Sequence, residues 1–226
     1  MQLTLTADGS HTLELTDLGE HYHSTEGAIE EARHVYMRPC LLAAFDRFAD
    51  TDQLHIFEMG FGTGLNALLS SLVAQQLHRK VLYTSVELHP VSSDIYSRLN
   101  YAEQLHLPPD SLNILHEAPW NETVAISPWF SLCKCYADIC SYEFPLQPFF
   151  HAVFYDAFAP QYQPSLWSAS LFGRMAPALH DGALLTTYCC KGDVKRALRA
   201  AGFLVEKLPG FGRKREMLRA TIVREQ

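Results

Sequence analysis

The fold is decided by one stretch of the chain, which reads Leu54-His55-Ile56-Phe57-Glu58-Met59-Gly60-Phe61-Gly62-Thr63-Gly64-Leu65-Asn66. The apolar run 54–57 indicates a short buried strand, and the alternate glycines after it indicate a tight turn. Leucines then recur at helical spacing over residues 65–77, which predicts a helix. A strand, a glycine-rich turn and a helix in this order are typical of the ligand-binding turn in an open α/β sheet.

Further apolar segments of strand length follow along the chain, most of them separated by helical segments. They cover residues 81–86, 131–136, 151–155, 183–188, 203–208 and 216–223. Strands separated by helices predict a parallel sheet that is buried on both faces. The last two segments have no helix between them and predict one antiparallel edge. The fold class is therefore a doubly wound α/β fold with a mostly parallel, seven-stranded sheet.

The N-terminal residues predict a small hairpin and helix extension. Residues 3–15 alternate between apolar and polar side chains around an Asp8-Gly9 turn, which indicates a β-hairpin. A helix follows, which we expect to be capped by Ser24 or Thr25 and interrupted at Pro39.

Composition favours one ordinary globular unit. The 226 residues are 48% apolar and 19% charged, which excludes disorder as the main state. No apolar run approaches the ~20 residues of a membrane span, and no secretory signal is visible, so we expect a cytoplasmic protein without membrane contact. Without repeats or long linkers, residues 1–50 are expected to pack as an extension on a continuous core of residues 51–226.

Charge is distributed unevenly over the chain. The net charge is −7, yet the chain from Arg174 onward contains eleven Lys and Arg residues and only five Asp and Glu residues. A basic C-terminal third on an acidic body indicates either a footprint for a polyanion or solvated helix faces. The six cysteines include no Cys-x-x-Cys pair, so we expect reduced thiols and no metal site.

Acidic residues follow the predicted strands. Glu87, Asp138 and Asp156 each come directly after one, and the carboxyl ends of parallel strands share one edge of the sheet. Glu87 lies 23 positions beyond Gly64, which is about where an acid binds the two ribose hydroxyls of a nucleoside. The sequence thus predicts a ligand that contains a nucleoside.

The glycine spacing narrows the ligand class. A dinucleotide site requires G-x-G-x-x-G so that a helix N-terminus faces a pyrophosphate. Here the spacing is G-x-G-x-G, and Glu58 precedes it. A carboxylate at this point repels phosphate but suits a cation. S-adenosylmethionine, which carries a sulfonium and an ammonium and no phosphate, fits this pattern.

Three longer motifs carry a resemblance to a known family. They are residues 58–66, residues 155–160 with Pro164 and Trp167, and residues 209–218, which read Pro-Gly-Phe-Gly-Arg-Lys-Arg-Glu-Met-Leu. Together with residues 27–35 they resemble the methyltransferase half of the bifunctional tRNA 5-methylaminomethyl-2-thiouridine biosynthesis family. The resemblance covers roughly residues 22–219 and implies a class I, Rossmann-like methyltransferase that uses S-adenosylmethionine.

This resemblance also implies a reaction. The enzyme would methylate 5-aminomethyl-2-thiouridine to 5-methylaminomethyl-2-thiouridine at the tRNA wobble position. In the bifunctional proteins a flavin-dependent oxidase domain follows, whereas this sequence ends at Gln226. The resemblance therefore implies a stand-alone methyl transferase, with a separate flavin oxidase acting upstream as one source of its substrate.

By the same resemblance, individual residues receive roles. The cofactor would be bound by Glu58, Gly60, Phe61, Gly62, Thr63, Gly64, Asn66, Glu87, Asp138 and Asp156. Of these, Glu58 would hold the methionine end, Glu87 the ribose and Asp138 the adenine amino group. Asp156 is the catalytic candidate that orients the amine and receives its proton. The tRNA would be bound by Phe158 and Pro160 at the acceptor slot and by Arg213, Lys214 and Arg215 at the phosphates of the anticodon stem-loop. Tyr22 and Ser24 would fold over the cofactor.

Two other functions stay open at the level of sequence. The methyl acceptor could be a small-molecule or protein amine, which the acidic body of the chain favours. Alternatively, the chain could be a non-catalytic module that binds S-adenosylmethionine or RNA. The intact glycine turn and Asp156 speak against this second alternative.

Overall fold

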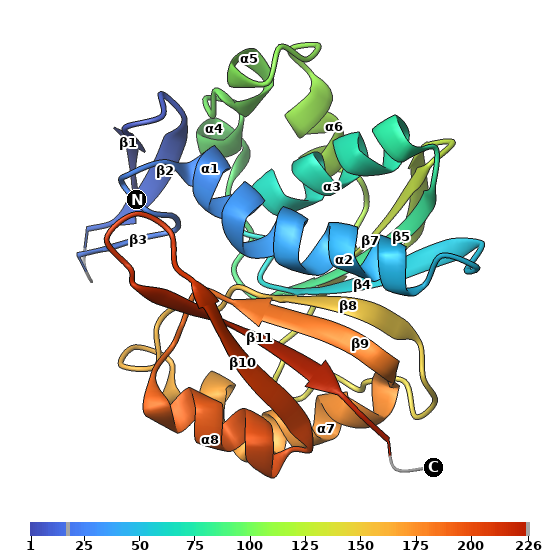
Figure 1. Ribbon diagram of the computed structural model, residues 1–226. Coiled ribbons are helices and arrows are strands. Elements are labelled where there is room, and N and C mark those ends of the chain that lie inside the picture. The colour runs from blue at the N-terminus through green and yellow to red at the C-terminus, as the bar shows by residue number, and fades with distance from the viewer. Residues whose placement is uncertain (17–18, 225–226) are drawn as a thin grey trace.

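The computed structural model describes residues 1–16 and 19–224 and is built around an eight-stranded sheet (Figure 1). The strand order is β10-β11-β9-β8-β4-β5-β7-β6. The strands are β4 (Gln53–Met59), β5 (Lys80–Glu87), β6 (Thr123–Ser127), β7 (Phe130–Tyr136), β8 (Phe150–Tyr155), β9 (Leu179–Thr187), β10 (Phe203–Pro209) and β11 (Glu216–Ile222). The five central strands, from β9 to β7, are parallel to one another, which confirms the doubly wound α/β class.

The sheet differs from the prediction in two respects. It has eight strands rather than seven, because the short strand β6 pairs antiparallel with β7 at the edge. β6 has only five residues, none of which is buried, and its apolar run is limited to Val124, Ala125 and Ile126. In addition, β11 pairs with both β9 and β10, so the antiparallel strand near the C-terminus lies one position inside the edge.

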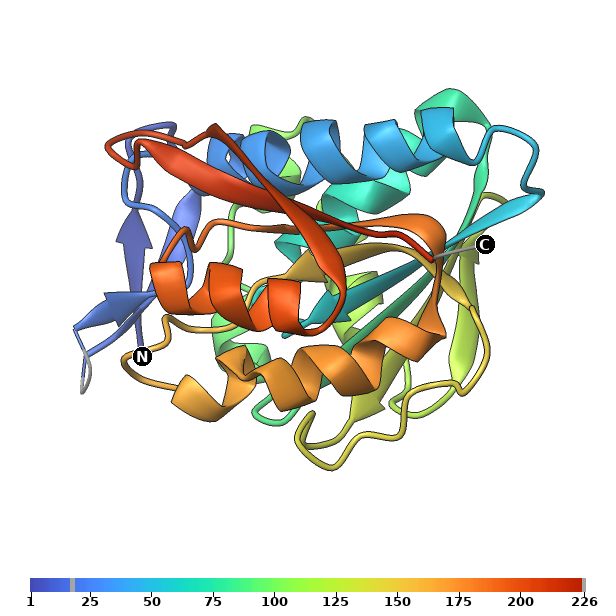
Figure 2. The same cartoon turned by 60° about the horizontal axis from the view of Figure 1, so that its bottom comes forward.

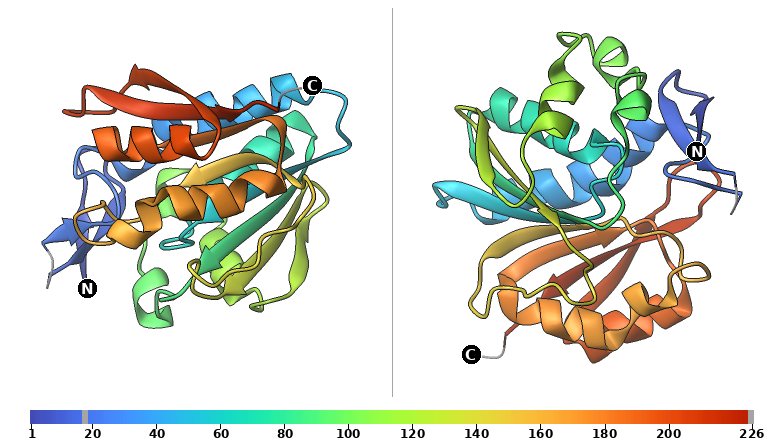
Figure 3. Two further views of the ribbon diagram at one scale, coloured as in Figure 1. Left: turned by 90° about the horizontal axis from the view of Figure 1, so that it is seen from below. Right: turned by 180° about the vertical axis from the view of Figure 1, so that it is seen from behind.

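Helices cover both faces of the sheet (Figure 2). One layer contains α1 (Ala28–Ala32), the π-helical segment η1 (Arg33–Leu42), α2 (Ala43–Arg47) and α3 (Leu65–Leu77), with α4 (Ser93–Tyr96), α5 (Tyr101–Gln104) and α6 (Ser111–Glu117) beyond it (Figure 3). The other layer contains η2 (Pro164–Trp167), α7 (Ala169–Met175), η3 (Ala176–Ala178) and α8 (Gly192–Ala200). In the described part of the chain, no helix combines the length and apolar character needed to cross a membrane.

The first helix is continuous where the sequence predicted an interruption. Helical residues run from Ala28 to Arg47 through Pro39, and the turns around this proline are π-helical. Proline clashes with the carbonyl group four residues before it in an α-helix, and a wider π-helical turn relieves that clash. The predicted cap is also wrong, because the first helical N–H groups are bound from the N-terminal hairpin. Ser10 Oγ accepts from Ala28 N at 3.2 Å, and Asp8 Oδ2 accepts from Glu30 N at 3.1 Å.

A small three-stranded sheet precedes this helix. It consists of β1 (Gln2–Leu5), β2 (His11–Leu15) and β3 (Glu20–His21), and the pairing of β1 with β2 confirms the predicted hairpin. Buried residues from this segment and from the helix, such as Leu13 and Ala44, belong to the same apolar core as Ile56 of β4. The division into residues 1–50 and 51–226 stays a prediction.

A tight loop joins β10 to β11 and lies against the start of α1 (Figure 1). Gly210 N donates to Arg215 O at 3.1 Å, and Lys214 N donates to Phe211 O at 3.0 Å. The backbone comes so close to itself that a Cβ atom on Gly210 would lie 2.2 Å from Lys214 O. This loop therefore depends on glycine at position 210.

We expect Gly210→Ala to lower the free energy of unfolding by about 2 kcal/mol or more, because backbone atoms cannot move aside as a flexible side chain does. Gly173→Ala is the matched control, since nothing lies within 4 Å of a Cβ at this position of α7. That change should stabilise by up to about 1 kcal/mol through helix propensity. Urea unfolding of both variants checks the difference, and equal stabilities would contradict it.

Candidate active site

The strand order reverses between β4 and β8, and a cavity of about 980 Å³ lies at the carboxyl ends of these strands. This is the position at which open α/β sheets bind ligands. Among the predicted site residues, the cavity is lined by Gly60, Phe61, Gly62, Thr63, Asn66, Glu87, Asp138, Asp156, Phe158 and Lys214. The other predicted site residues are not part of the described lining; they are Glu58, Gly64, Pro160, Arg213 and Arg215.

The glycine turn after β4 has the conformation that glycine alone adopts readily. Gly62 has a φ of 50°, and a Cβ atom there would lie 3.2 Å from the ring of Tyr22. The Tyr22 ring packs edge-on against Phe158 with 5.1 Å between the ring centroids. Tyr22 and Ser24 both line the cavity, as expected for residues that cover a bound ligand.

Glu87 holds the glycine turn in place. Its Oε2 atom accepts from Gly62 N at 3.0 Å, and its Oε1 atom accepts from His89 N at 2.7 Å. The carboxylate at the end of β5 is thus fixed by two backbone donors while it faces the cavity. Each oxygen keeps one lone pair for a hydroxyl donor.

Asp138 and Phe158 lie on loops that follow β7 and β8. Asp138 is exposed, and its Oδ1 atom accepts from Cys140 N at 2.8 Å. Phe158 is half-buried, and its backbone oxygen accepts from Trp167 Nε1 at 2.8 Å. Trp167 itself is buried against Tyr155, so it supports the loop that presents Phe158.

Asp156 has both carboxylate oxygens occupied by side-chain donors. Tyr36 Oη donates to Oδ1 at 2.6 Å, and Asn66 Nδ2 donates to Oδ2 at 3.1 Å. Burial raises the pKa of Asp156 to about 6, and the charge of Glu31 adds to the rise. The bonds from Tyr36 and Asn66 and the charge of Lys214 act in the opposite direction. The carboxylate is thus largely ionised at pH 7.

Glu58 lies beneath the cavity and not in its wall. It is 1% exposed on β4, where it accepts from Ser85 Oγ at 2.7 Å. Burial raises the pKa of Glu58 to about 8, so the carboxyl group is mainly protonated at neutral pH. Glu58 is therefore placed to support the glycine turn from below, and not to contact a charged group of a bound molecule directly.

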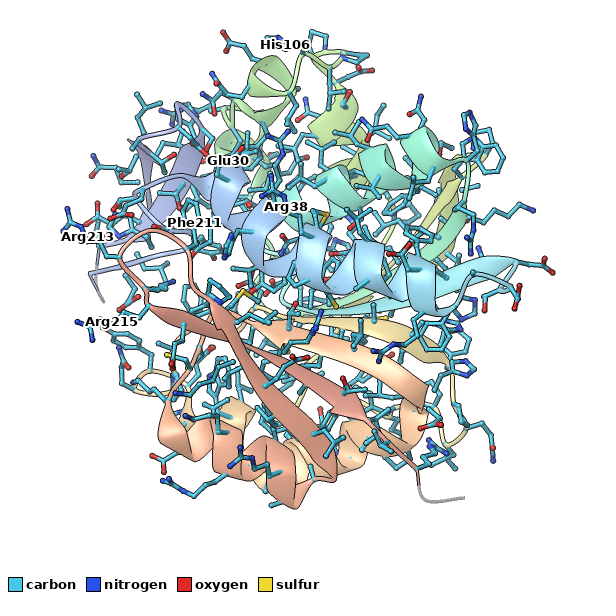
Figure 4. The ribbon with its side chains drawn as sticks, viewed as in Figure 1. Glu30, Arg38, His106, Phe211, Arg213 and Arg215 are labelled. Carbon is cyan, nitrogen blue, oxygen red and sulfur yellow. The ribbon has the colours of Figure 1, made fainter. Side chains whose placement is uncertain are left out.

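Of the three basic residues of the β10–β11 loop, one lines the cavity and two project outward. Lys214 Nζ lies in the cavity wall, 2.8 Å from Glu31 Oε1 and 4.3 Å from the centroid of the Tyr188 ring. Arg213 bonds to Glu26 at 2.9 Å but keeps its side chain 96% exposed. Arg213 and Arg215 both project outward from the loop (Figure 4).

Comparisons with known proteins agree with this geometry. Residues 130–223 match the model of a family described as S-adenosyl-L-methionine-dependent methyltransferase. The chain is 35% identical over 211 residues to the tRNA 5-methylaminomethyl-2-thiouridine biosynthesis bifunctional protein MnmC of Methylobacillus flagellatus, which covers 88% of the chain and 32% of that protein. The MnmC protein of Pseudomonas aeruginosa strain UCBPP-PA14 is 33% identical over 225 residues, which covers 90% of the chain and 32% of that protein.

The chain belongs to the S-adenosyl-L-methionine-dependent methyltransferases. It spans about a third of the length of the MnmC relatives that it matches. Among solved structures, MnmC2 from Aquifex aeolicus superposes with a TM-score of 0.76 at 24% identity, covering all of this chain and 72% of that one. This likeness confirms the methyltransferase fold.

The cavity fits the methyl donor of the methyltransferase family in its charge. The lining contains Glu20, Glu31, Glu87, Asp138 and Asp156. These acids suit the sulfonium and ammonium groups of S-adenosylmethionine. Asn66 also lines the cavity, and its amide nitrogen is bound to Asp156.

Sequence reasoning missed two residues of this methyltransferase site. Tyr36 binds the carboxylate of Asp156, which lies 120 positions later in the chain. Glu31 accepts from Ser24 N at 2.6 Å and pairs with Lys214. Glu31 is part of a motif that carried the family resemblance, which was the one available signal. Tyr36 lies inside the helix that the sequence predicted, but its partner is 120 positions away, so no local pattern marked it.

Proposed function

We propose that this methyltransferase transfers a methyl group from S-adenosylmethionine to the primary amine of 5-aminomethyl-2-thiouridine at the tRNA wobble position. The observation that carries the proposal is the ionised Asp156 in the cavity wall, held by two donors, in a chain related to 5-methylaminomethyl-2-thiouridine biosynthesis proteins. The product named in those relatives contains the methylated amine that such a site would form.

The cofactor is assigned to the residues that line the glycine turn and its neighbours. Glu87 would hold the ribose hydroxyls, Asp138 the adenine amino group, and Asn66 the methionine end. Gly60, Phe61, Gly62 and Thr63 would form the wall against which the nucleoside lies. Glu58 and Gly64 would support this wall from outside the cavity.

The bound cofactor supplies an electrophilic methyl group next to a positive charge. The residues of the chain must bring a neutral amine to it, because an ammonium has no lone pair. With a Lys-like pKa of about 10.4, neutralising the amine at pH 7 costs on the order of 4 kcal/mol. Asp156 would orient the nitrogen and receive its proton, while Lys214 disfavours a second cation nearby. Phe158 would shape the slot for the base, with Pro160 behind it on the same loop.

The tRNA is assigned to the rim around the β10–β11 loop. Arg213 and Arg215 are exposed there and point outward, whereas Lys214 turns into the cavity. We therefore propose Arg213 and Arg215 as contacts to the phosphates of the anticodon stem-loop, and Lys214 as part of the acceptor end.

We expect the double variant Arg213→Ala, Arg215→Ala to bind tRNA more weakly and with less salt dependence. Loss of two phosphate contacts should reduce the slope of log K against log salt by roughly 1 to 2. Lys80→Ala is the matched control, because Lys80 is exposed at the amino end of β5, opposite the site. Filter binding between roughly 50 and 200 mM salt measures both slopes. Unchanged slopes in the double variant would refute the assignment.

Labelled methyl transfer separates this proposal from its rivals. The enzyme should be offered undermodified total tRNA, a set of small primary amines and a protein extract freed of RNA. Label in the RNA fraction alone supports the proposal, and label in either other fraction moves the acceptor to that class. Cofactor binding without transfer to any fraction would favour a non-catalytic module. A cytoplasmic location and a separate flavin oxidase that supplies the amine are proposals that follow from the tRNA substrate.

A further inference from the structure

Asp156 is bound from two different elements, and one of its partners lies outside the cavity. Asn66 belongs to α3 and lines the cavity, whereas Tyr36 belongs to η1 and does not occur in its described lining. Tyr36 is 3% exposed, and its ring packs on Phe154 of β8 with 5.3 Å between the centroids. The hydroxyl of Tyr36 therefore reaches the site through Asp156 alone.

The π-helical segment holds Tyr36 in this position. Four residues further on, the Cys40 thiol lies 3.6 Å from Val153 O of β8 and 3.5 Å from Leu184 O of β9. The segment thereby packs on β8, the strand that Asp156 follows directly. π-Helical turns are rare and occur often at functional sites, where they redirect a side chain. Here such turns aim a tyrosine hydroxyl at a carboxylate.

We propose that Tyr36 is a positioning residue for methyl transfer, which fixes the Asp156 carboxylate by donating to Oδ1 and keeps it ionised and directed at the acceptor amine. This inference rests on the proposed function for the role of Asp156 in turnover. Its first part, the effect of Tyr36 on the carboxylate, concerns the protein alone.

The charge around Asp156 explains why a strong donor is needed. The charge of Glu31 on α1 raises the pKa of Asp156. Asp156 in turn raises the pKa of the buried Glu58 on β4. Lys214 from the β10–β11 loop acts against this rise, and the hydroxyls of Tyr83 and Tyr188 face the same region. Burial and proximity to Asp156 raise the pKa of Tyr36 well above its ordinary value, so Tyr36 stays a protonated donor.

The sign of the effect follows from these directions. The Tyr36 bond lowers the pKa of Asp156, so its removal raises that pKa from about 6 toward neutrality. In Tyr36→Phe the Asp156 carboxylate is therefore protonated at a higher pH than in the wild type. The acidic limb of the kcat profile moves up by about one pH unit. At pH 6 this corresponds to a loss of about fivefold in rate. Above pH 8 Asp156 is ionised in both enzymes, so the part of the rate loss that comes from its protonation disappears.

The direct test is a carbon NMR titration of the Asp156 carboxyl group in the folded protein, with the Asp156→Asn spectrum to assign its signal. We expect the midpoint in Tyr36→Phe to lie about one unit above that of the wild type. Tyr101→Phe is the matched control, because Tyr101 is also fully buried and its hydroxyl has no partner within the described residues. Its titration should coincide with that of the wild type. Equal midpoints for Tyr36→Phe and the wild type would overturn the proposal.

Site-specific 3-fluorotyrosine at position 36 covers the case in which Tyr36→Phe does not fold. The more acidic phenol donates a stronger hydrogen bond, so the Asp156 midpoint should move down instead of up. An unmoved midpoint with this residue would likewise overturn the inference. If the midpoints move as expected but no acceptor is methylated, the placement of Tyr36 stands and the proposed function fails.

Discussion

Asp156→Asn should reduce kcat by at least about 100-fold while the affinity for S-adenosylmethionine stays close to that of the wild type. The amide keeps the size of the side chain, but it carries no negative charge and cannot receive a proton. It also accepts only one of the two bonds that Tyr36 and Asn66 donate to the carboxylate. The amine would therefore be neither oriented nor relieved of its proton.

Single-turnover methyl transfer and calorimetric cofactor binding separate the two effects in this variant. Asp52→Asn is the matched control, since Asp52 is exposed near the amino end of β4, away from the cavity. Turnover at the wild-type level in Asp156→Asn would remove Asp156 from the chemistry. A loss of cofactor affinity as large as the loss of rate would make it a cofactor ligand first.

Glu87→Ala should weaken S-adenosylmethionine binding by about 100-fold. The change removes the carboxylate assigned to the ribose and leaves the N–H groups of Gly62 and His89 without their acceptor. Hydrogen bonds to a charged group contribute about 1.5–3 kcal/mol each, and 1.4 kcal/mol corresponds to tenfold in affinity. Loss of the two bonds from the ribose hydroxyls therefore corresponds to about two orders of magnitude in affinity or more.

Calorimetry with S-adenosylmethionine measures this effect without any acceptor. Glu103→Ala removes an exposed carboxylate from α5 and serves as the matched control. The account requires weak binding in Glu87→Ala and unchanged binding in Glu103→Ala. A variant that binds as tightly as the wild type would show that Glu87 holds the turn without contacting the ligand.

The parts that could be predicted from sequence are those in which local pattern determines structure. The run from Leu54 to Gly64 predicted the parallel sheet, and Glu87, Asp138 and Asp156 at the ends of three strands predicted the cavity at its carboxyl edge. The short strand β6 was missed, because its apolar run of three residues, 124–126, is shorter than the runs that mark the other strands.

Contacts between segments that lie far apart in the sequence could not be predicted from local sequence patterns. Tyr36 donates to Asp156, which lies 120 positions later in the chain, and no local pattern marks a contact between segments so far apart. Glu58 reads as a loop carboxylate in sequence but lies under the turn, where burial keeps it mainly protonated. Lys214 reads as one of three equivalent basic residues, and only the folded loop turns it toward Glu31.

The central claim is that this methyltransferase acts on the amine of a wobble uridine. The most direct test is nucleoside analysis by mass spectrometry after incubation of the enzyme and isotopically labelled S-adenosylmethionine with tRNA that bears 5-aminomethyl-2-thiouridine. The account predicts labelled 5-methylaminomethyl-2-thiouridine, formed as the aminomethyl nucleoside disappears, and neither change with the Asp156→Asn enzyme. An unchanged aminomethyl nucleoside in the presence of an enzyme that binds its cofactor tightly would contradict the claim.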